Sequence, residues 1–224
     1  MKKILIATAL IGAFYSSLAL AKTEGGVIGI DLIRSSAQVK SNSDSADDAG
    51  LTEYYSHKKK DSGYSVGVNY KYAFNFNDFF IAPGLSYNFI NNEAKVGYSE
   101  SSDDFYSQSV KLNNQISFQT NLGYDVSDKF AVYVPVGVSS FGYEIKTSDV
   151  SGSSVTTKKT GRESSIFYGL GLSYQPAKNW VMNLEYNKFQ DLKLTSANAA
   201  TINGGAIKAN VGVNMVKLGV AYRF

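Results

Sequence analysis

The amino-acid sequence predicts an all-β fold: an eight-stranded antiparallel up-and-down β-barrel that spans a membrane. Three observations predict it. The composition suits strands, with 16 Tyr, 13 Phe and 20 Gly against only 3 Pro in 224 residues. Eight segments alternate bulky apolar residues with small or polar ones, which is the period of two that a strand requires. The connections between these segments are alternately short and long, as in a membrane barrel with short periplasmic turns and long extracellular loops.

The first 21 residues, MKKILIATALIGAFYSSLALA, are organised like a secretory signal peptide. Lys2 and Lys3 give a basic start, an apolar run follows, and small residues precede Ala21. We predict cleavage after Ala21, which leaves residues 22–224 as one outer-membrane barrel domain. An uncleaved membrane anchor is the alternative, but Tyr15 interrupts the apolar run.

Charge, cysteine content and hydropathy exclude several classes of protein. Cleavage removes Lys2 and Lys3 and no acidic residue, so the formal charge falls from +3 to +1 and gives no electrostatic reason to expect nucleic acid as a partner. The chain has no cysteine, so an exported form has no disulfide framework. After the signal peptide no run of about 18 apolar residues occurs, which excludes a membrane-spanning helix.

The first four predicted strands are residues 25–40, 63–74, 79–89 and 106–126. Their apolar faces hold, in order, Ile28, Ile30 and Leu32; Tyr64, Val66, Val68, Tyr70, Tyr72 and Phe74; Ile81, Pro83, Leu85, Tyr87 and Phe89; and Val110, Leu112, Ile116, Phe118, Leu122 and Tyr124. Small or polar residues occupy the positions between them.

The last four predicted strands are residues 130–143, 165–174, 180–189 and 207–224. Their apolar faces hold, in order, Val132, Val134, Val136 and Val138; Ile166, Tyr168, Leu170, Leu172 and Tyr174; Trp180, Met182, Leu184 and Tyr186; and Val216, Leu218, Val220, Tyr222 and Phe224. In the last strand the apolar residues upstream, such as Val211 and Val213, have the opposite parity. A β-bulge near Asn214 would explain this break; otherwise one half of the segment lies outside the sheet.

The short connections lie near residues 75–79, 126–130 and 175–179, and the long polar ones near 41–62, 92–105, 147–161 and 190–206. The interior of an eight-stranded barrel is narrow, so the small polar face fits inside it and the bulky face meets lipid. A soluble up-and-down barrel would reverse the two faces. Aromatic residues near both ends are expected to form two membrane-interface belts. One set comprises Phe76, Phe79, Tyr124, Phe130, Tyr174, Trp180, Tyr222 and Phe224, and the other Tyr64, Phe89, Tyr186 and Phe189.

The last residues, Lys217-x-Gly219-x-x-Tyr222-x-Phe224, resemble the C-terminal assembly signal of bacterial outer-membrane barrels. With the signal peptide and the eight strands, the mature chain resembles the small porin-like surface antigens of the opacity, Ail and OmpX type. The match is one of pattern over the whole barrel. The resemblance implies insertion by the barrel-assembly machinery into the outer membrane of a Gram-negative bacterium, and a surface adhesin, an immune-evasion factor or a structural envelope protein.

Four charged residues have the parity of the barrel interior: Asp31, Lys71, Lys111 and Glu185. Opposite charges there would pair and plug the lumen, because an unpaired charge in a confined space of low dielectric constant is costly. A narrow conducting path is the alternative.

The long loops are the remaining place for a binding function, because a rigid scaffold commonly carries its binding residues on loops. The candidate binding residues are Tyr54, Tyr55, Lys58, Lys59, Lys60 and Phe105. The three lysines suit lipopolysaccharide phosphates or acidic host glycans. Plain solvation of a variable surface is the alternative reading of the same residues.

Catalysis and metal binding are not expected. The only histidine, His57, lies in a predicted loop beside three lysines, and no strand carries the histidine that hydrolases of this fold use. The clusters Asp44, Asp47, Asp48 and Asp103, Asp104 lack calcium-loop spacing. We therefore predict no enzyme activity and no cofactor. The expected function is binding of host or envelope molecules by the loops, with outer-membrane lipid, lipopolysaccharide and host surface or serum proteins as partners. The alternatives are a passive envelope barrel or narrow channel, and then a lipid-modifying enzyme.

Overall fold

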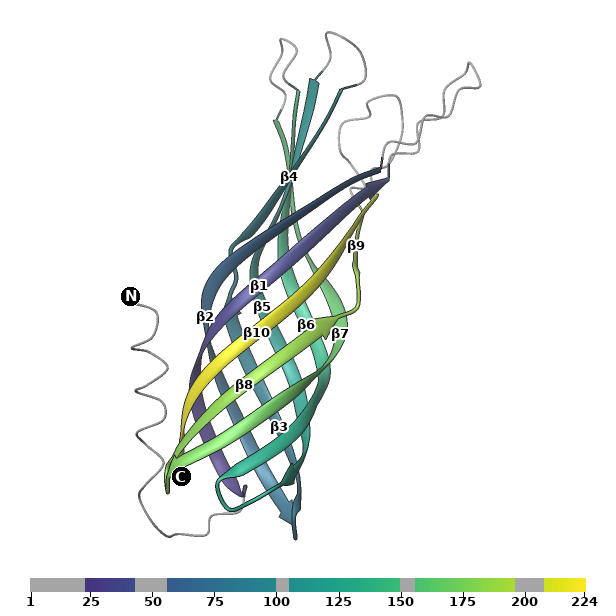
Figure 1. The fold of residues 1–224 in the computed structure, drawn as a ribbon. Helices are drawn as coiled ribbons and strands as arrows, with labels where there is room; N and C mark the ends of the chain where they lie inside the picture. Colours follow the sequence, from purple (N-terminus) through teal and green to yellow (C-terminus); the bar gives the residue numbers. More distant parts are fainter. Residues whose placement is uncertain (1–22, 43–55, 100–104, 150–155, 196–207) are drawn as a thin grey trace, which may run out of the picture.

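The computed structural model describes residues 23–42, 56–99, 105–149, 156–195 and 208–224, and its strands form one antiparallel sheet that closes on itself (Figure 1). The strands are β1 (Gly25–Asn42), β2 (Ser56–Phe76), β3 (Phe79–Phe89), β4 (Asn92–Ser99), β5 (Phe105–Asp125), β6 (Phe130–Asp149), β7 (Thr156–Ala177), β8 (Trp180–Phe189), β9 (Leu192–Thr195) and β10 (Lys208–Arg223). Strands β3 and β4 both pair with β5, and β8 and β9 both pair with β10, so the ring has the eight predicted positions. Within the described ranges, no helix is long and apolar enough to cross a membrane.

The first and last strands close the barrel. The ladder between β1 and β10 runs from Val27 opposite Arg223 to Asn42 opposite Lys208 without a register shift. Beyond it, the backbone N–H of Phe224 donates to the carbonyl of Gly26 at 3.0 Å. A bulge near Asn214 is therefore wrong, and the parity break in this strand needs another explanation.

The connections differ at the two ends. Short turns occupy residues 77–78, 126–129 and 178–179, as predicted, and Asn77 has the positive φ of 62° that an asparagine tolerates in a tight turn. The opposite connections are shorter than predicted, because residues 56–62 pair with β1 and residues 92–99 pair with β5. Residues 1–22, which include the predicted signal peptide, lie outside the described residues.

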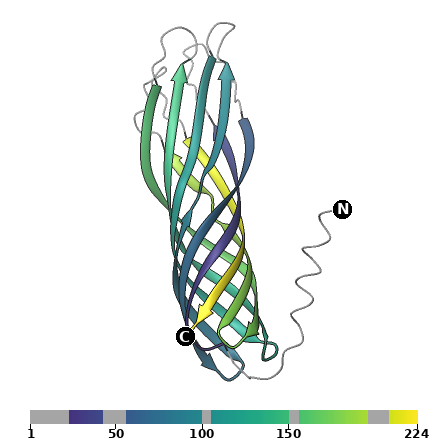
Figure 2. The ribbon, with the colours of Figure 1, turned by 90° about the vertical axis from the view of Figure 1, so that its left-hand side faces the viewer.

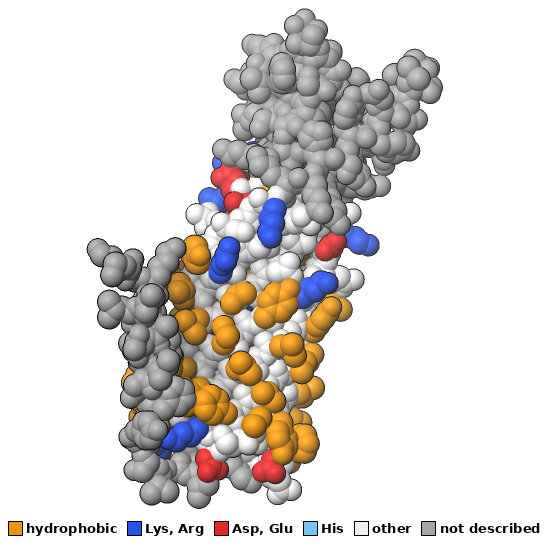
Figure 3. Space-filling view, viewed as in Figure 1, with side chains coloured by type: hydrophobic (Ala, Val, Ile, Leu, Met, Phe, Trp, Pro, Cys, Tyr) orange, Lys and Arg blue, Asp and Glu red, His pale blue; other side chains and the backbone are white. Residues whose placement is uncertain are grey.

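The part of the barrel next to the short turns, here called the lower barrel, has the predicted polarity. On its outer face each strand carries bulky exposed residues, such as Val132, Val134, Val136 and Val138 on β6. A membrane-spanning strand needs about 9–11 residues, and this apolar stretch of β6 runs from Phe130 to Val138. Figure 3 shows hydrophobic side chains gathered on the visible face of the lower part of the molecule.

The strands continue far beyond the lower barrel, in what is here called the upper barrel. Strands β2, β5, β6 and β7 have 20–22 residues each, about twice the length that a membrane requires. Figure 2 shows the strands running on, at an incline, to the end opposite the C-terminus.

The ring is not paired all the way up. The β2–β3 ladder ends at Val66 opposite Phe89, and the β7–β8 ladder ends at Phe167 opposite Phe189. Above these points the pairings found in the described residues join only β2, β1, β10 and β9 on one side, and β4, β5, β6 and β7 on the other. These two groups, the β1 sheet and the β6 sheet, diverge at the upper end of Figure 1.

The polarity of the strands reverses in the upper barrel. On β6 the outward positions change from Val138 to Ser140, while the inward positions change from Ser139 to Phe141, which is fully buried. Similar changes on the other strands build one apolar core between the two sheets. Its members are Ile33, Ala37, Val39, Ile90, Ala94, Val110, Leu112, Phe141, Tyr143, Ile145, Phe167, Phe189, Leu192, Leu194, Val211, Val213 and Met215.

This core explains three predictions that were wrong. Val211 and Val213 face inward because the interior is apolar there, so no bulge is needed to account for their parity. Val110 and Leu112, expected on the lipid-facing side with Ile116, face inward instead, because the irregularity on β5 between Leu112 and Asn114 inverts the two faces of the strand. Phe189, expected in the outer aromatic belt, is a member of the core.

Candidate functional site

A charged cluster lies in the lumen of the lower barrel. The Glu185 carboxylate on β8 is 3.6 Å from Lys71 Nζ on β2 and 3.5 Å from Lys217 Nζ on β10, and its side chain is only 3% exposed. Asp31 on β1 is also buried and accepts a hydrogen bond from Asn69 at 2.9 Å. Antiparallel closure brings these residues together, because β10 lies between β1 and β8.

Neutral groups complete the coordination of Glu185. Asn187 Nδ2 donates to the carboxylate at 2.6 Å, the Tyr133 hydroxyl at 3.2 Å and Gln119 Nε2 at 3.4 Å. A buried carboxylate needs such partners as well as opposite charge. Tyr133 could have been recognised in the sequence as an aromatic residue on the small polar face, opposite the valines of the same strand; the two amides carry no comparable signal.

Lys111 is not part of this cluster, which corrects the sequence prediction. Its neighbours Val110 and Leu112 are buried in the apolar core, so Lys111 faces outward. It lies in register with Glu93 on β4 and Glu144 on β6. Lys111 was placed inside on the assumption that one alternation runs unbroken through this strand. The irregularity at Asn113 inverts the two faces of the strand, so the assumption fails there.

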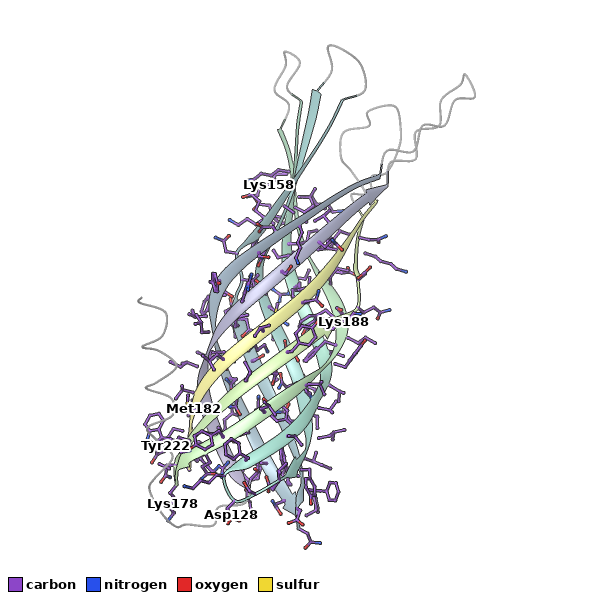
Figure 4. The ribbon with its side chains drawn as sticks, viewed as in Figure 1. Asp128, Lys158, Lys178, Met182, Lys188 and Tyr222 are labelled. Carbon is purple, nitrogen blue, oxygen red and sulfur yellow. The ribbon has the colours of Figure 1, made fainter. Side chains whose placement is uncertain are left out.

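The C-terminal residues have separate positions. Lys217 and Gly219 face the lumen, and a Cβ added to Gly219 would meet Asp31 Oδ1 too closely unless the Asp31 side chain shifted. Tyr222 and Phe224 are exposed on the outer face, where Tyr222 packs edge-on against Trp180 with ring centroids 5.7 Å apart. Figure 4 shows Tyr222 at the end with the short turns.

A second polar layer lies above the charged cluster. Asn88 donates to Gln115 at 2.7 Å, Gln115 donates to Ser139 at 2.9 Å, and the Ser139 and Ser117 hydroxyls share a hydrogen bond of 2.7 Å. These four side chains are buried. With the apolar core above and a smaller apolar cluster below, around Phe80 and Ala131, side chains fill the lumen in successive layers.

The predicted loop-binding residues are described only in part. Tyr54 and Tyr55 lie outside the described residues. Lys58, Lys59 and Phe105 belong to strands β2 and β5 rather than to loops, and their side chains are not described. Lys60 is also on β2, where its side chain is exposed on the outer face of the β1 sheet.

The outer faces of the two sheets carry further charged residues besides Lys60. On the β6 sheet, Glu144 forms ion pairs with Lys158 at 2.8 Å and Lys146 at 3.0 Å, which lower the pKa of its carboxyl group below the ordinary value. On the β1 sheet and the end of β8, the exposed cations are Arg34, Lys60, Lys188 and Lys193. Lys158 and Lys188 are labelled in Figure 4.

Comparison with known proteins identifies a protein family and several similar folds. The family described as "Outer membrane protein beta-barrel domain" matches residues 6–224. No curated protein sequence is significantly similar to the chain.

Three solved structures have similar folds. OprG from Pseudomonas aeruginosa is 14% identical with a TM-score of 0.56, covering 92% of this chain and 99% of that chain. The outer membrane protease OmpT from Escherichia coli is 10% identical with a TM-score of 0.50, covering 93% and 99%. Ail, the attachment invasion locus protein of Yersinia pestis, in complex with the heparin analogue sucrose octasulfate, is 18% identical with a TM-score of 0.44, covering 89% and 99%. At these identities the likeness to OprG and OmpT shows the fold alone.

Proposed function

The chain belongs to the outer membrane protein β-barrel family, and from this premise we propose that it binds host or envelope molecules through its extracellular end. It is an outer-membrane barrel of the kind found in Gram-negative bacteria. The observation that carries the proposal is the filled lumen. Because layers of buried side chains occupy the lower and upper barrel, the surface beyond the membrane is the part left for function.

The filled lumen argues against the narrow channel. An ion would have to cross the apolar core around Phe141 and Met215, whose side chains are at most 1% exposed. A passive structural role is compatible with the same lumen, and it is the alternative that an experiment must separate from binding.

Catalysis is not proposed. The buried acid Glu185 is held by two lysines and three neutral donors, which leaves it poorly placed to act as a general base. The side chain of His57 lies outside the described part of the structure.

The test is attachment by a displayed protein. The full chain is displayed on a non-adherent Gram-negative host, beside a variant in which residues 43–55, 100–104, 150–155 and 196–207 are each replaced by an Asn-Gly turn. We expect attachment to mammalian cells that the trimmed variant loses, although it reaches the membrane in equal amount. Absence of attachment from the full chain would contradict adhesion to those cells and favour the passive role.

We also propose that cleavage after Ala21 precedes assembly and that the assembly machinery reads Lys217, Gly219, Tyr222 and Phe224. The outward position of the last two residues supports this, because their side chains are accessible at the end of β10. Intact mass measurement of the outer-membrane form should give the mass of residues 22–224, and a mass that retains the first 21 residues would contradict cleavage.

A further inference from the structure

The two sheets of the upper barrel differ in how their outward cations are compensated. On the β6 sheet, Lys146 and Lys158 both pair with Glu144, and Lys111 lies between Glu93 and Glu144 in register. Arg162 on β7 donates to Asn114 at 2.7 Å and to the Ser140 carbonyl at 2.8 Å. Lys146, Lys158 and Arg162 therefore have acceptors within the protein.

The outward face of the β1 sheet and the adjoining end of β8 is different. It carries Arg34, Lys60, Lys188 and Lys193, and among the residues whose side chains are described there the only exposed acid is Asp191. Among the ion pairs found in the described residues, none involves these four cations. Such an excess of positive charge on one face suits an anionic partner.

The height of this face above the lower barrel identifies the partner. Arg34 lies opposite Tyr64 on β2 and Val216 on β10, both at the upper limit of the apolar band. Its guanidinium lies 6.0 Å from the centre of the Tyr64 ring, a cation–π distance. Figure 3 shows basic side chains directly above the hydrophobic side chains of the visible face. In an outer-membrane barrel the lipid headgroups begin where the outward apolar residues end.

Lys188 lies at the same boundary two strands away. It is opposite Asn214 on β10, one outward position above Tyr186, whose hydroxyl donates to Asn214 at 3.2 Å. Neighbouring strands lie about 4.8 Å apart, and the positions on β10 opposite Arg34 and Lys188 are two residues apart, so the Cα atoms of Arg34 and Lys188 are separated by about 12 Å. Lys60 and Lys193 continue the basic surface further from the membrane.

We propose that this face, formed by β2, β1, β10, β9 and the upper end of β8, binds the phosphate groups of lipopolysaccharide in the outer leaflet. Arg34 and Lys188 contact the phosphates nearest the bilayer, and Lys60 and Lys193 contact the more distant anionic groups. A guanidinium and an ammonium at the headgroup level are the groups that recognise lipid phosphates. Lipopolysaccharide is one of the envelope molecules of the proposed function, so this inference rests on that function and names a partner for it. The site lies on the strands and does not depend on the extracellular loops, which the attachment to host cells requires.

The experiment measures binding of purified, refolded full chain to lipid A in detergent. The test variant is Arg34→Gln with Lys188→Gln, and the matched control is Lys146→Gln with Lys158→Gln, which removes the same charge from the β6 sheet. We expect the test variant to bind bisphosphorylated lipid A about 10- to 30-fold more weakly than the unmodified chain. The control should change less than about twofold.

Further measurements distinguish lipid phosphate from free phosphate as the ligand and test whether the variants fold. Dephosphorylated lipid A should bind the unmodified chain as weakly as bisphosphorylated lipid A binds the test variant, and inorganic phosphate at the same phosphate concentration should not displace the lipid. The variant Arg34→Lys with Lys188→Arg keeps the charge and should retain binding. Folding of each variant is checked by the difference in gel mobility between heated and unheated samples. If the Gln pair does not fold, Lys188→Gln with Lys193→Gln takes its place.

Three results would overturn the proposal. Equal losses in the test and control variants would show that only net charge matters. Unchanged binding in a folded test variant would show that Arg34 and Lys188 do not bind the lipid phosphates. Displacement by inorganic phosphate would assign the site to a free anion. The loop-trimmed chain should bind lipid A normally, so failure of this proposal and failure of the attachment function are distinguishable.

Discussion

The lower and upper barrels are built from the same strands but have opposite polarity. Within β6, the lower half carries valines outward and Ser139 inward, and the upper half carries Ser140 outward and Phe141 inward. The first arrangement suits lipid outside and polar groups inside, and the second suits water outside and an apolar core. Alternation alone therefore does not indicate which face of a strand points inward, because that depends on whether lipid or water surrounds the strand.

The largest expected effect is the loss of stability on substitution of Glu185, in the polar interior of the lower barrel. Glu185→Ala should lower the free energy of unfolding by about 3–5 kcal/mol, because it leaves Lys71 and Lys217 buried without a counter-charge. Reversible urea unfolding in lipid vesicles measures it. A triple variant that also replaces both lysines with Met should recover most of the loss, and an equal loss in the triple variant would contradict the pairing.

The upper interior should respond to lost volume instead of lost charge. Phe141→Ala removes a fully buried ring that packs edge-on against Phe189 at 5.1 Å, so we expect a loss of about 3–5 kcal/mol, at the lower end if the two sheets relax. The same unfolding assay applies. The exposed Val138→Ala, on the same strand, serves as the control, and a loss as large as that of Phe141→Ala would show that no core exists there.

The next largest loss of stability is expected on the outer face of the lower barrel. Leu170→Arg on β7 places a charge in the lipid-facing band and should cost about 2–4 kcal/mol. Ser164→Arg, exposed on the same face of the same strand, should cost less than about 0.5 kcal/mol because it lies beside water. Similar losses of unfolding free energy at both positions would contradict a boundary between lipid and water at this height of the barrel.

A smaller effect is expected at Gly219. Gly219→Ala puts a methyl group too close to Asp31 Oδ1, and the shift that this forces should cost about 1–3 kcal/mol. In the double variant Asp31→Ala with Gly219→Ala, the methyl group has room. Non-additive losses in a double-mutant cycle would support the contact, and strict additivity would contradict it.

The sequence predicted the lower barrel well. The outward residues of β7 and β10, the short turns and the closure of the ring follow from alternation and spacing. Asp31, Lys71 and Glu185 were predicted to face inward, but their meeting depends on the register between β1, β10 and β8, which alternation does not specify.

The upper barrel was harder to predict for a physical reason. A strand whose inward residues are apolar and whose outward residues are polar has the same period as one with the reverse arrangement, so Val211 and Val213 looked like a register error. One extra residue at Asn113 was sufficient to misplace Lys111. The polar outer residues of β2 and β7, such as Lys60 and Lys158, looked like loops because they lacked an apolar face in contact with lipid.

The most direct test of the reversal is a cysteine scan of the outward positions of β6. The chain has no cysteine, so each variant carries a single label. Spin labels at positions 132, 134, 136 and 138 should be accessible to oxygen in the bilayer, and labels at 140, 142, 144 and 146 to a water-soluble nickel complex. The change should fall between Val138 and Ser140. Lipid accessibility that continued through Glu144, or water accessibility that began at Val134, would contradict the reversal of polarity along the barrel.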